Sequence, residues 1–264
     1  MKNVRSIFVT VMTFVSLTSI YANNVEDIIV NTTNGPVQGE KRLIENDQGE
    51  YYAFHAIPYA SPPVAELRFK PTKPITTNWI NAYNASDSNG KNVKTCPQKA
   101  FGGLGQGSTD EDCLYLWVYT PRISNDTSLL PVLVWIHGGA FVIGSGAFSD
   151  NGPDRFMKGN DIIMVSINYR LGLLGFLSLG NSNVAGNMGL LDQVMALNWI
   201  KNNIKAFGGN PNMITIMGQS AGSLSVTYHM LSPLSKGLFH RVIAESGAPV
   251  SLSYHEISAE EAKR

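Results

Sequence analysis

The sequence has no surplus of charge of either sign and few charged residues altogether. Its 264 residues hold 20 Lys and Arg against 20 Asp and Glu, and charged residues make up only 15% of the chain. Nucleic-acid-binding proteins and proteins that adhere to anionic membranes through basic clusters carry a clear excess of Lys and Arg. The charge balance therefore argues against both of these classes.

The sequence also lacks the composition of a disordered or repetitive protein. Hydrophobic residues make up 44% of the chain, which is enough for a large core, whereas disordered chains combine low hydrophobicity with high net charge. The 25 glycines and 13 prolines follow no repeat period, which excludes collagen-like and low-complexity chains. We found no internal repeat and no linker that would separate two domains, so we expect a single domain after the N-terminal segment.

The N-terminal apolar stretch is short for a membrane anchor. It runs from Ser6 to Ile20 and includes three threonines, whereas a helix needs about 20 apolar residues to cross a bilayer. Lys2 and Arg5 precede it, and Ala22 is small enough to stand before a cleavage site. We predict that residues 1–22 are a cleaved secretory signal and that the mature protein is extracellular, with no stable membrane insertion.

Cysteine is scarce, with only Cys96 and Cys113 in the chain. Two cysteines alone make a poor zinc site. In an oxidising compartment a pair of cysteines tends to form a disulfide, which for a loop of this size would stabilise the fold by roughly 3 kcal/mol. Two free thiols are the alternative, and secretion disfavours it.

Three Asn-x-Ser/Thr sequons also fit a secreted protein. All three occur in polar stretches rich in turn residues, where a glycan could be accommodated. Their asparagines, the predicted glycosylation sites, are Asn31, Asn84 and Asn125.

Strand and helix patterns alternate through the second half of the chain. Short apolar runs rich in β-branched and aromatic residues suit strands buried on both faces, and apolar residues spaced by three or four predict a helix. This order predicts an α/β fold with a mostly parallel sheet covered by helices. The predicted strands are 28–30, 51–57, 114–119, 132–136, 162–167, 213–217 and 241–244, and the predicted helices are 189–205 and 221–231.

The segment Gly218-Gln219-Ser220-Ala221-Gly222 lies between a predicted strand and a predicted helix. This is the context of the G-x-S-x-G nucleophile elbow, in which a sharp turn holds a serine in a strained conformation and its neighbours must lack side chains. The start of the helix then offers backbone N–H groups to a developing negative charge. The motif alone can occur by chance, but its position between strand and helix makes Ser220 a candidate nucleophile.

A second glycine-rich segment follows the predicted strand 132–136. It reads Trp135-Ile136-His137-Gly138-Gly139-Ala140-Phe141. HGG-type loops at this place supply oxyanion-hole N–H groups in esterases and lipases, because small residues let the backbone approach the substrate oxygen. An ordinary glycine-rich turn is the alternative, and the presence of the elbow disfavours it.

With these motifs the sequence resembles the type-B carboxylesterases, a family that includes insect carboxylesterases, juvenile hormone esterases and cholinesterases. Their fold is the α/β-hydrolase fold. The resemblance extends from about residue 28 to residue 250, with several long motifs in the right order. These motifs are Arg68-Phe69, Glu111-Asp112-Cys113-Leu114-Tyr115-Leu116, Gly186 through Gln193, Phe207 through Gly222, and Ser246-Gly247-Ala248-Pro249.

The resemblance implies a role for each residue of the two glycine-rich segments. Ser220 resembles the catalytic nucleophile. Gly139, Ala140 and Ala221 resemble the residues whose N–H groups form the oxyanion hole, and Gly138 opens the turn that carries them.

The resemblance also implies two structural features outside these segments. Cys96 and Cys113 would form the first disulfide of the family. Two ion pairs would join Arg68 to Glu111 and Arg170 to Asp192.

The sequence departs from the family's functional residues at three places, of which the first lies beside the serine and the second between the cysteines. Gln219 replaces the glutamate that usually precedes the serine, a feature similar to juvenile hormone esterases and some other insect esterases. The segment between the cysteines has no tryptophan, whereas cholinesterases carry one there to bind a quaternary ammonium. A choline ester is therefore not the expected substrate. Trp117, where the family usually has Asn, lies in a predicted strand, and core packing is its expected role.

The third departure is an incomplete triad, since in this fold an acid and then a histidine follow the serine. His229 lies nine residues beyond Ser220 on the same predicted helix, roughly 13 Å away along its axis, and His240 precedes a strand at the end away from the serine. We expect neither to be the base, nor any of the other late candidates, which are His255, Glu245, Glu256, Glu260 and Glu261. Residues 258–264 also resemble the start of a helix, which suggests a truncated chain.

We therefore expect residues 23–264 to be the N-terminal half of one α/β-hydrolase domain. The expected protein is a secreted serine carboxylesterase that hydrolyses small apolar carboxylic esters through an acyl-serine intermediate. Its acid and histidine would lie beyond residue 264, and this segment alone would be inactive. No metal or organic cofactor is implied. The alternative is a non-catalytic, esterase-like adhesion or ligand-binding protein, and retention of Ser220 and the HGG segment argues against it.

Overall fold

The computed structural model describes residues 28–44, 49–86, 94–99, 108–123, 128–147, 153–159, 161–181, 183–248 and residue 260. Its N-terminal strands are β1 (Ile28–Thr32), β2 (Gly35–Leu43), β3 (Glu50–Pro58), β4 (Tyr83–Asn84), β5 (Tyr115–Thr120), β6 (Leu130–Ile136) and β7 (Ile163–Ile167). The later strands are β8 (Ser178–Asn181), β9 (Val184–Ala185), β10 (Gly209–Gln219) and β11 (Arg241–Glu245). The helices are α1 (Asp154–Met157), α2 (Gly172–Phe176), α3 (Met188–Asn203) and α4 (Ala221–Leu231), with short 3₁₀ turns at 65–67, 204–207 and 233–235.

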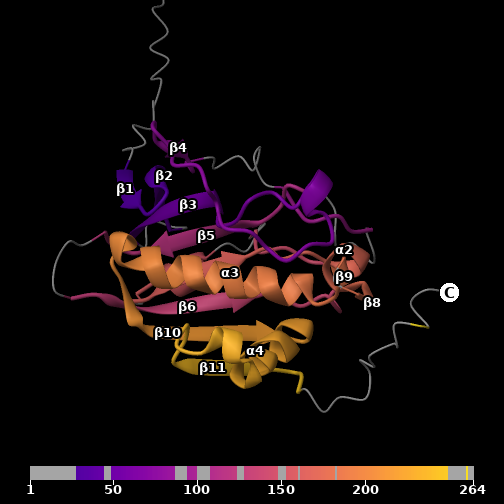
Figure 1. Ribbon diagram of the computed structural model, residues 1–264. Helices are drawn as coiled ribbons and strands as arrows, with labels where there is room; N and C mark the ends of the chain where they lie inside the picture. The colour runs from indigo at the N-terminus through magenta and orange to yellow at the C-terminus, as the bar shows by residue number, and fades with distance from the viewer. Residues whose placement is uncertain are drawn as a thin grey trace, which may run out of the picture.

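One mixed sheet forms the centre of the molecule (Figure 1). Its strands lie in the order β1-β2-β3-β5-β7-β6-β10-β11, with β4 beside β2. The four strands β7, β6, β10 and β11 are parallel to one another, as the alternation of strands and helices predicted. The strands β1, β2, β3 and β5 are antiparallel to their neighbours along this path, and β5 is antiparallel to β7.

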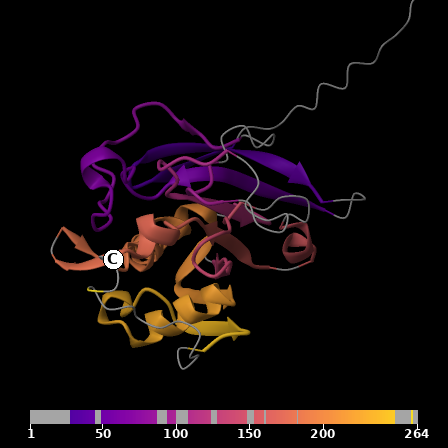
Figure 2. The same ribbon diagram turned by 90° about the vertical axis from the view of Figure 1, so that its right-hand side faces the viewer.

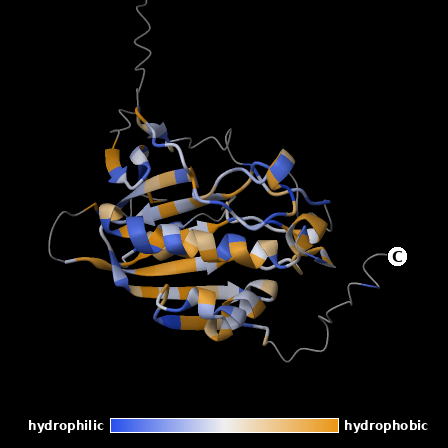
Figure 3. Cartoon of the chain, in the orientation of Figure 1, coloured by the Kyte–Doolittle hydropathy of each residue, from blue (hydrophilic) through white to orange (hydrophobic). Residues whose placement is uncertain are grey.

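The two faces of the sheet carry separate hydrophobic clusters because side chains alternate along each strand. On β5, Leu116 and Val118 belong to the larger cluster, which also contains residues of α3 and α4. Trp117 and Tyr119 belong to a smaller cluster on the opposite face, with Met157 of α1. The two long helices lie on one face of the sheet, in front of it in Figure 1 and to one side of it in the turned view of Figure 2. Figure 3 shows hydrophobic residues along the central strands.

Trp117 is 1% exposed, so its predicted packing role is confirmed. The predicted helix 221–231 coincides with α4, and the predicted strands lie within two residues of β5, β6, β7 and β11 at both ends. Strand β10 is longer than predicted because Gly209–Asn212 also takes extended structure.

Helix α3 ends two residues earlier than predicted, and its buried face extends beyond the apolar residues that predicted it. Of those residues, Leu197, Ile200 and Ile204 are buried without measurable exposure, whereas Leu190 and Val194 are only half-buried. Asp192 and Gln193 are also buried without measurable exposure, because each has polar partners inside the protein. A pattern based on apolar residues alone cannot detect such positions.

The predicted signal segment, residues 1–22, lies outside the described residues, as does most of 249–264. Among the described helices, none has both the length and the apolar character to cross a membrane.

Candidate active site

Ser220 occupies the single position between strand β10 and helix α4. Its backbone has φ 55° and ψ −121°, a conformation that L-residues rarely adopt and that marks a strained turn. A Cβ atom on Gly218 would lie 2.3 Å from the carbonyl oxygen of Gly222, and one on Gly222 would lie 2.1 Å from that of Ile136. Both positions therefore require glycine, as the elbow motif predicts.

A second tight turn, residues 139–143, lies beside this elbow because β6 and β10 are parallel neighbours. Ile136, at the end of β6, pairs with Gly218. Within the turn the N–H groups of Val142 and Ile143 both donate to the carbonyl oxygen of Gly139, at 2.9 and 3.0 Å. Gly139, Ala140 and Phe141 all have positive φ, between 55° and 101°. We call residues 139–143 the oxyanion turn, after the role that the sequence predicts for Gly139 and Ala140.

Gly138 joins the oxyanion turn to the elbow. A Cβ atom at Gly138 would lie 2.6 Å from the carbonyl oxygen of Gln219 and 3.3 Å from Cβ of Ser220. The residues predicted to work together, Gly138, Gly139, Ala140, Ser220 and Ala221, are thus brought to one end of two adjacent strands.

The end of β11 and the segment after it also contact the elbow. The N–H of Ser220 donates to the carbonyl oxygen of Glu245 at 2.9 Å, and the hydroxyl of Ser223 donates to that of Gly247 at 2.6 Å. Ser246 between them has φ 56°. The elbow is therefore fixed from both neighbouring strands, β6 and β11.

A buried polar chain lies beneath the elbow and was not predicted from the sequence. The imidazole of His229 contacts the hydroxyl of Ser235 and the side-chain oxygen of Gln193, both at 2.8 Å. Gln193 donates to Ser225, whose hydroxyl donates to the carbonyl oxygen of Ala221. Burial lowers the pKa of His229 to about 4, so this ring is neutral at pH 7.

None of the histidine rings in the described ranges hydrogen-bonds to the hydroxyl of Ser220. His137 stacks on Tyr169, and burial lowers its pKa to about 4. His229 belongs to the buried chain, and Nδ1 of His240 accepts the N–H of Ile214 near the start of the parallel pairing. Of the other late candidates, Glu245 and Glu260 are exposed, while His255, Glu256 and Glu261 lie outside the described residues.

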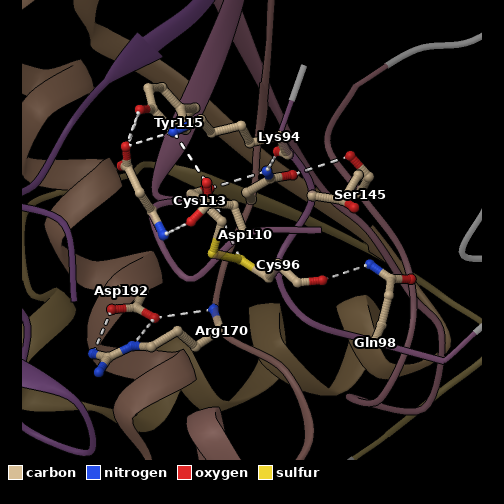
Figure 4. Close-up of a disulfide and its surroundings, with 12 residues drawn as sticks. Lys94, Cys96, Gln98, Asp110, Cys113, Tyr115, Ser145, Arg170 and Asp192 are labelled. Atoms are coloured by element: carbon tan, nitrogen blue, oxygen red, sulfur yellow. Dashed lines mark hydrogen bonds and ion pairs between the residues drawn. A yellow bond between two sulfur atoms is a disulfide. The ribbon is translucent and has the colours of Figure 1, made fainter. Parts of the chain in front are cut away.

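The disulfide between Cys96 and Cys113 is present, as predicted, and both residues are buried (Figure 4). Both ion pairs are present as well. Arg170 and Asp192 form a buried pair, with two guanidinium nitrogens each 2.8 Å from a carboxylate oxygen. Arg68 and Glu111 form a partly exposed pair at 2.6 Å.

Two of the three predicted glycosylation sites lie in the described residues, and both side chains are exposed. Asn31 is on the outermost strand β1. Asn84 is on β4, and its side-chain oxygen accepts the N–H and the hydroxyl of Ser86, the serine of its own sequon. Asn125 lies outside the described residues.

No group of three or more His, Cys, Asp or Glu in the described part of the chain is arranged to hold a metal ion.

Comparison with known proteins agrees with this geometry. The family model described as "Carboxylesterase family" matches residues 26–263. Venom carboxylesterase-6 of Apis mellifera is 48% identical over 223 residues, which cover 83% of this chain and 38% of that protein. Esterase E4 of Myzus persicae is 43% identical over 257 residues, covering 94% of this chain and 44% of that protein.

A solved structure shares the fold. The crystal structure of juvenile hormone esterase from Manduca sexta, with OTFP covalently attached, has a TM-score of 0.78 and 37% identity, covering 86% of this chain and 42% of that one. The chain thus spans about two fifths of the length of these relatives. Its sheet, its elbow and its match over nearly all its residues lead to one conclusion: the chain belongs to the carboxylesterase family and has the α/β-hydrolase fold of these carboxylic ester hydrolases.

Proposed function

We propose that this chain is the N-terminal half of a secreted serine carboxylesterase that hydrolyses apolar carboxylic esters, with Ser220 as its nucleophile. The observation that carries the proposal is the strained backbone of Ser220, held between Gly218 and Gly222 next to the oxyanion turn. Strain of this kind persists only where the surrounding structure imposes it, and it is common at catalytic nucleophiles.

In the proposed reaction the Ser220 oxygen attacks the ester carbonyl carbon, and its proton passes to a histidine supplied by residues beyond 264. The carbonyl oxygen becomes negatively charged and accepts hydrogen bonds from the N–H groups of Gly139, Ala140 and Ala221. The C–O bond to the alcohol then breaks, and the histidine returns the proton to the departing alcohol. Water then attacks the acyl carbon while the histidine takes its proton. The bond to the Ser220 oxygen breaks, the histidine returns the proton to that oxygen, and the carboxylic acid leaves.

The length of the relatives supports a base outside this chain, since the matched region covers only 38–44% of each of them.

The surroundings of the oxyanion turn support an apolar substrate. Val142 in the turn and Leu173 in α2 are 51% and 71% exposed, and Phe141 packs against Phe176. Residues 1–22 would direct secretion, and Asn31, Asn84 and Asn125 would carry glycans.

The first experiment is to sequence the native transcript past the codon for Arg264. A reading frame that continues through an acidic residue and a later histidine supports the proposal. A stop codon at that point removes the triad and favours the non-catalytic alternative.

The second experiment uses the full-length protein and a p-nitrophenyl ester of a short fatty acid. Ser220→Ala should abolish hydrolysis, whereas Ser232→Ala at the far end of α4 should retain it. Full activity of the Ser220→Ala variant would exclude Ser220 as the nucleophile.

A further inference from the structure

The oxyanion turn is held at both ends, at its start next to Gly138 (the entrance) and at its end next to Gly144 (the exit). The entrance is fixed by β6 and by the contact of Gly138 with the elbow. At the exit, a Cβ atom on Gly139 would lie 2.0 Å from the carbonyl oxygen of Ile143, so the two ends of the turn touch. Any shift of the next residue, Gly144, therefore acts directly on Gly139.

The side chain of Gln98 forms two hydrogen bonds with the backbone of Gly144. The N–H of Gly144 donates to Oε1 of Gln98, and Nε2 of Gln98 donates to the carbonyl oxygen of Gly144, both at 2.8 Å. A Cβ atom on Gly144 would lie 2.3 Å from Nδ1 of His137, so this residue is also confined on its other side. The paired hydrogen bonds fix the orientation of the Gly144 peptide groups as well as their position.

Gln98 is itself anchored to the disulfide. Its Nε2 also donates to the carbonyl oxygen of Cys96 at 3.1 Å, and Figure 4 shows this contact beside the Cys96–Cys113 bond. The side chain of Asn168 adds a second link. It donates to the carbonyl oxygen of Cys113, and its oxygen accepts the N–H of Gly146.

We propose that Gln98 is a positioning residue for the oxyanion turn, through which the Cys96–Cys113 disulfide holds the N–H groups of Gly139 and Ala140 in place. The inference rests on the proposed function, because it gives Gln98 a role in the chemistry of that site. Gln98 does not touch the reacting atoms. It acts through Gly144, and its effect is on the geometry of the donors.

The test uses full-length protein and the variant Gln98→Met, which keeps the length of the side chain and removes its hydrogen bonds. Misplacing catalytic donors lowers the rate more than it lowers substrate binding. We expect kcat for a p-nitrophenyl ester to fall about tenfold while KM changes less than twofold. Affinity for a trifluoromethyl ketone, which adds to a serine to form a tetrahedral oxyanion, should fall by the same factor as kcat/KM.

The matched control is Thr95→Val. It removes a hydroxyl bond to the carbonyl oxygen of Ser108, in the same disulfide-linked segment but away from Gly144. This variant should retain wild-type kcat and inhibitor affinity. Wild-type kcat and inhibitor affinity in Gln98→Met would overturn the inference.

A third measurement separates this inference from the proposed function. Amide hydrogen exchange of a peptide spanning residues 138–147 should speed up in Gln98→Met and stay unchanged in Thr95→Val. If the wild-type protein shows no hydrolysis that depends on Ser220, the proposed function fails. In that case the exchange rates alone decide whether Gln98 holds the turn. Exchange in Gln98→Met at the wild-type rate would refute the positioning role of Gln98.

Discussion

Gly138 and Gln219 approach each other so closely that a single added carbon would not fit between them. A Cβ atom at Gly138 would lie 2.6 Å from the carbonyl oxygen of Gln219, which is backbone and cannot move aside. The end of β6 and the end of β10 are therefore in direct contact at the point where the oxyanion turn meets Ser220.

Gly138→Ala should push the oxyanion turn away from Ser220. Loss of one oxyanion donor lowers kcat by roughly 10²–10³ in a serine hydrolase, and we expect a fall of that order in the full-length enzyme. Gly159→Ala is the control. Gly159, unlike Gly138, has a positive φ of 67°, so alanine strains the backbone there, but no atom lies within 4 Å of its Cβ position. A Gly138→Ala enzyme with kcat close to wild type would contradict the packing argument.

Asp192→Asn should destabilise the protein strongly. Asp192 is buried without measurable exposure and binds the Arg170 side chain, the Arg170 N–H and the Thr72 hydroxyl. Removing one partner of a buried pair leaves an uncompensated charge and costs about 3–5 kcal/mol. Urea unfolding of the full-length protein measures this loss. Glu111→Gln, in the exposed pair with Arg68, should shift the unfolding midpoint far less, and equal effects of the two substitutions would argue against this reasoning.

Stability should fall as the pH is lowered from about 6.5 to about 4. Burial lowers the pKa of His229 to about 4, so over this range the unfolded state binds a proton that the folded state excludes. The stabilisation is complete above the unfolded pKa and is lost as the pH falls towards the folded pKa, by about 3 kcal/mol for a histidine shifted this far.

His137 has a similar shift and adds to the same pH dependence. His229→Asn should therefore remove part of the pH dependence and leave the contribution of His137. Unfolding midpoints of wild type and His229→Asn at pH 7.5 and pH 5 provide the measurement. An unchanged difference between the two pH values would show that His229 does not titrate on unfolding.

The double variant Cys96→Ala/Cys113→Ala should lose about 3 kcal/mol of stability on the chain-entropy account of disulfides. Both cysteines are buried in the larger hydrophobic cluster, and alanine adds no polar group there. Thermal unfolding without reductant compares this variant with the wild type. The same midpoint for both would mean that the disulfide adds no net stability.

Asn84→Gln should remove one N-glycan from the protein secreted by eukaryotic cells. Asn84 is exposed, and Ser86 of its sequon already contacts the asparagine oxygen. The expected result is a mass decrease of one glycan relative to the wild type, and N-glycosidase treatment should bring the two proteins to nearly the same mass. An unchanged mass would show that this sequon is not used.

The sequence predicted those parts of the structure that rest on local chemistry. The elbow could be predicted because it is a local motif, in which Gly218 must lack a side chain to pass its near neighbour Gly222. The central strands could be predicted because they are short, largely apolar runs, as in β7, whose five residues are all buried. Helix α4 matched its predicted bounds at both ends.

The parts that could not be predicted depend on tertiary partners. Strand β2 is rich in polar residues, and its buried Glu40 is accommodated by contacts with Arg42 and His55. The buried chain through Gln193 and His229 joins positions far apart in sequence. Gln98 lies in a polar stretch with no periodic pattern, and only the fold brings it to Gly144.

The position of β10 in the sheet has a consequence for how the protein folds. β10 lies between β6 and β11, and its pairing with β6 joins Val132 to Ile214, far along the chain. Closing so long a loop is entropically costly, and non-local parallel pairing is intrinsically slow. During synthesis β6 and β7 can pair before β10 is made. The oxyanion turn and Ser220 therefore meet late, and until then β6 presents an open apolar edge that a chaperone or a second nascent chain can occupy.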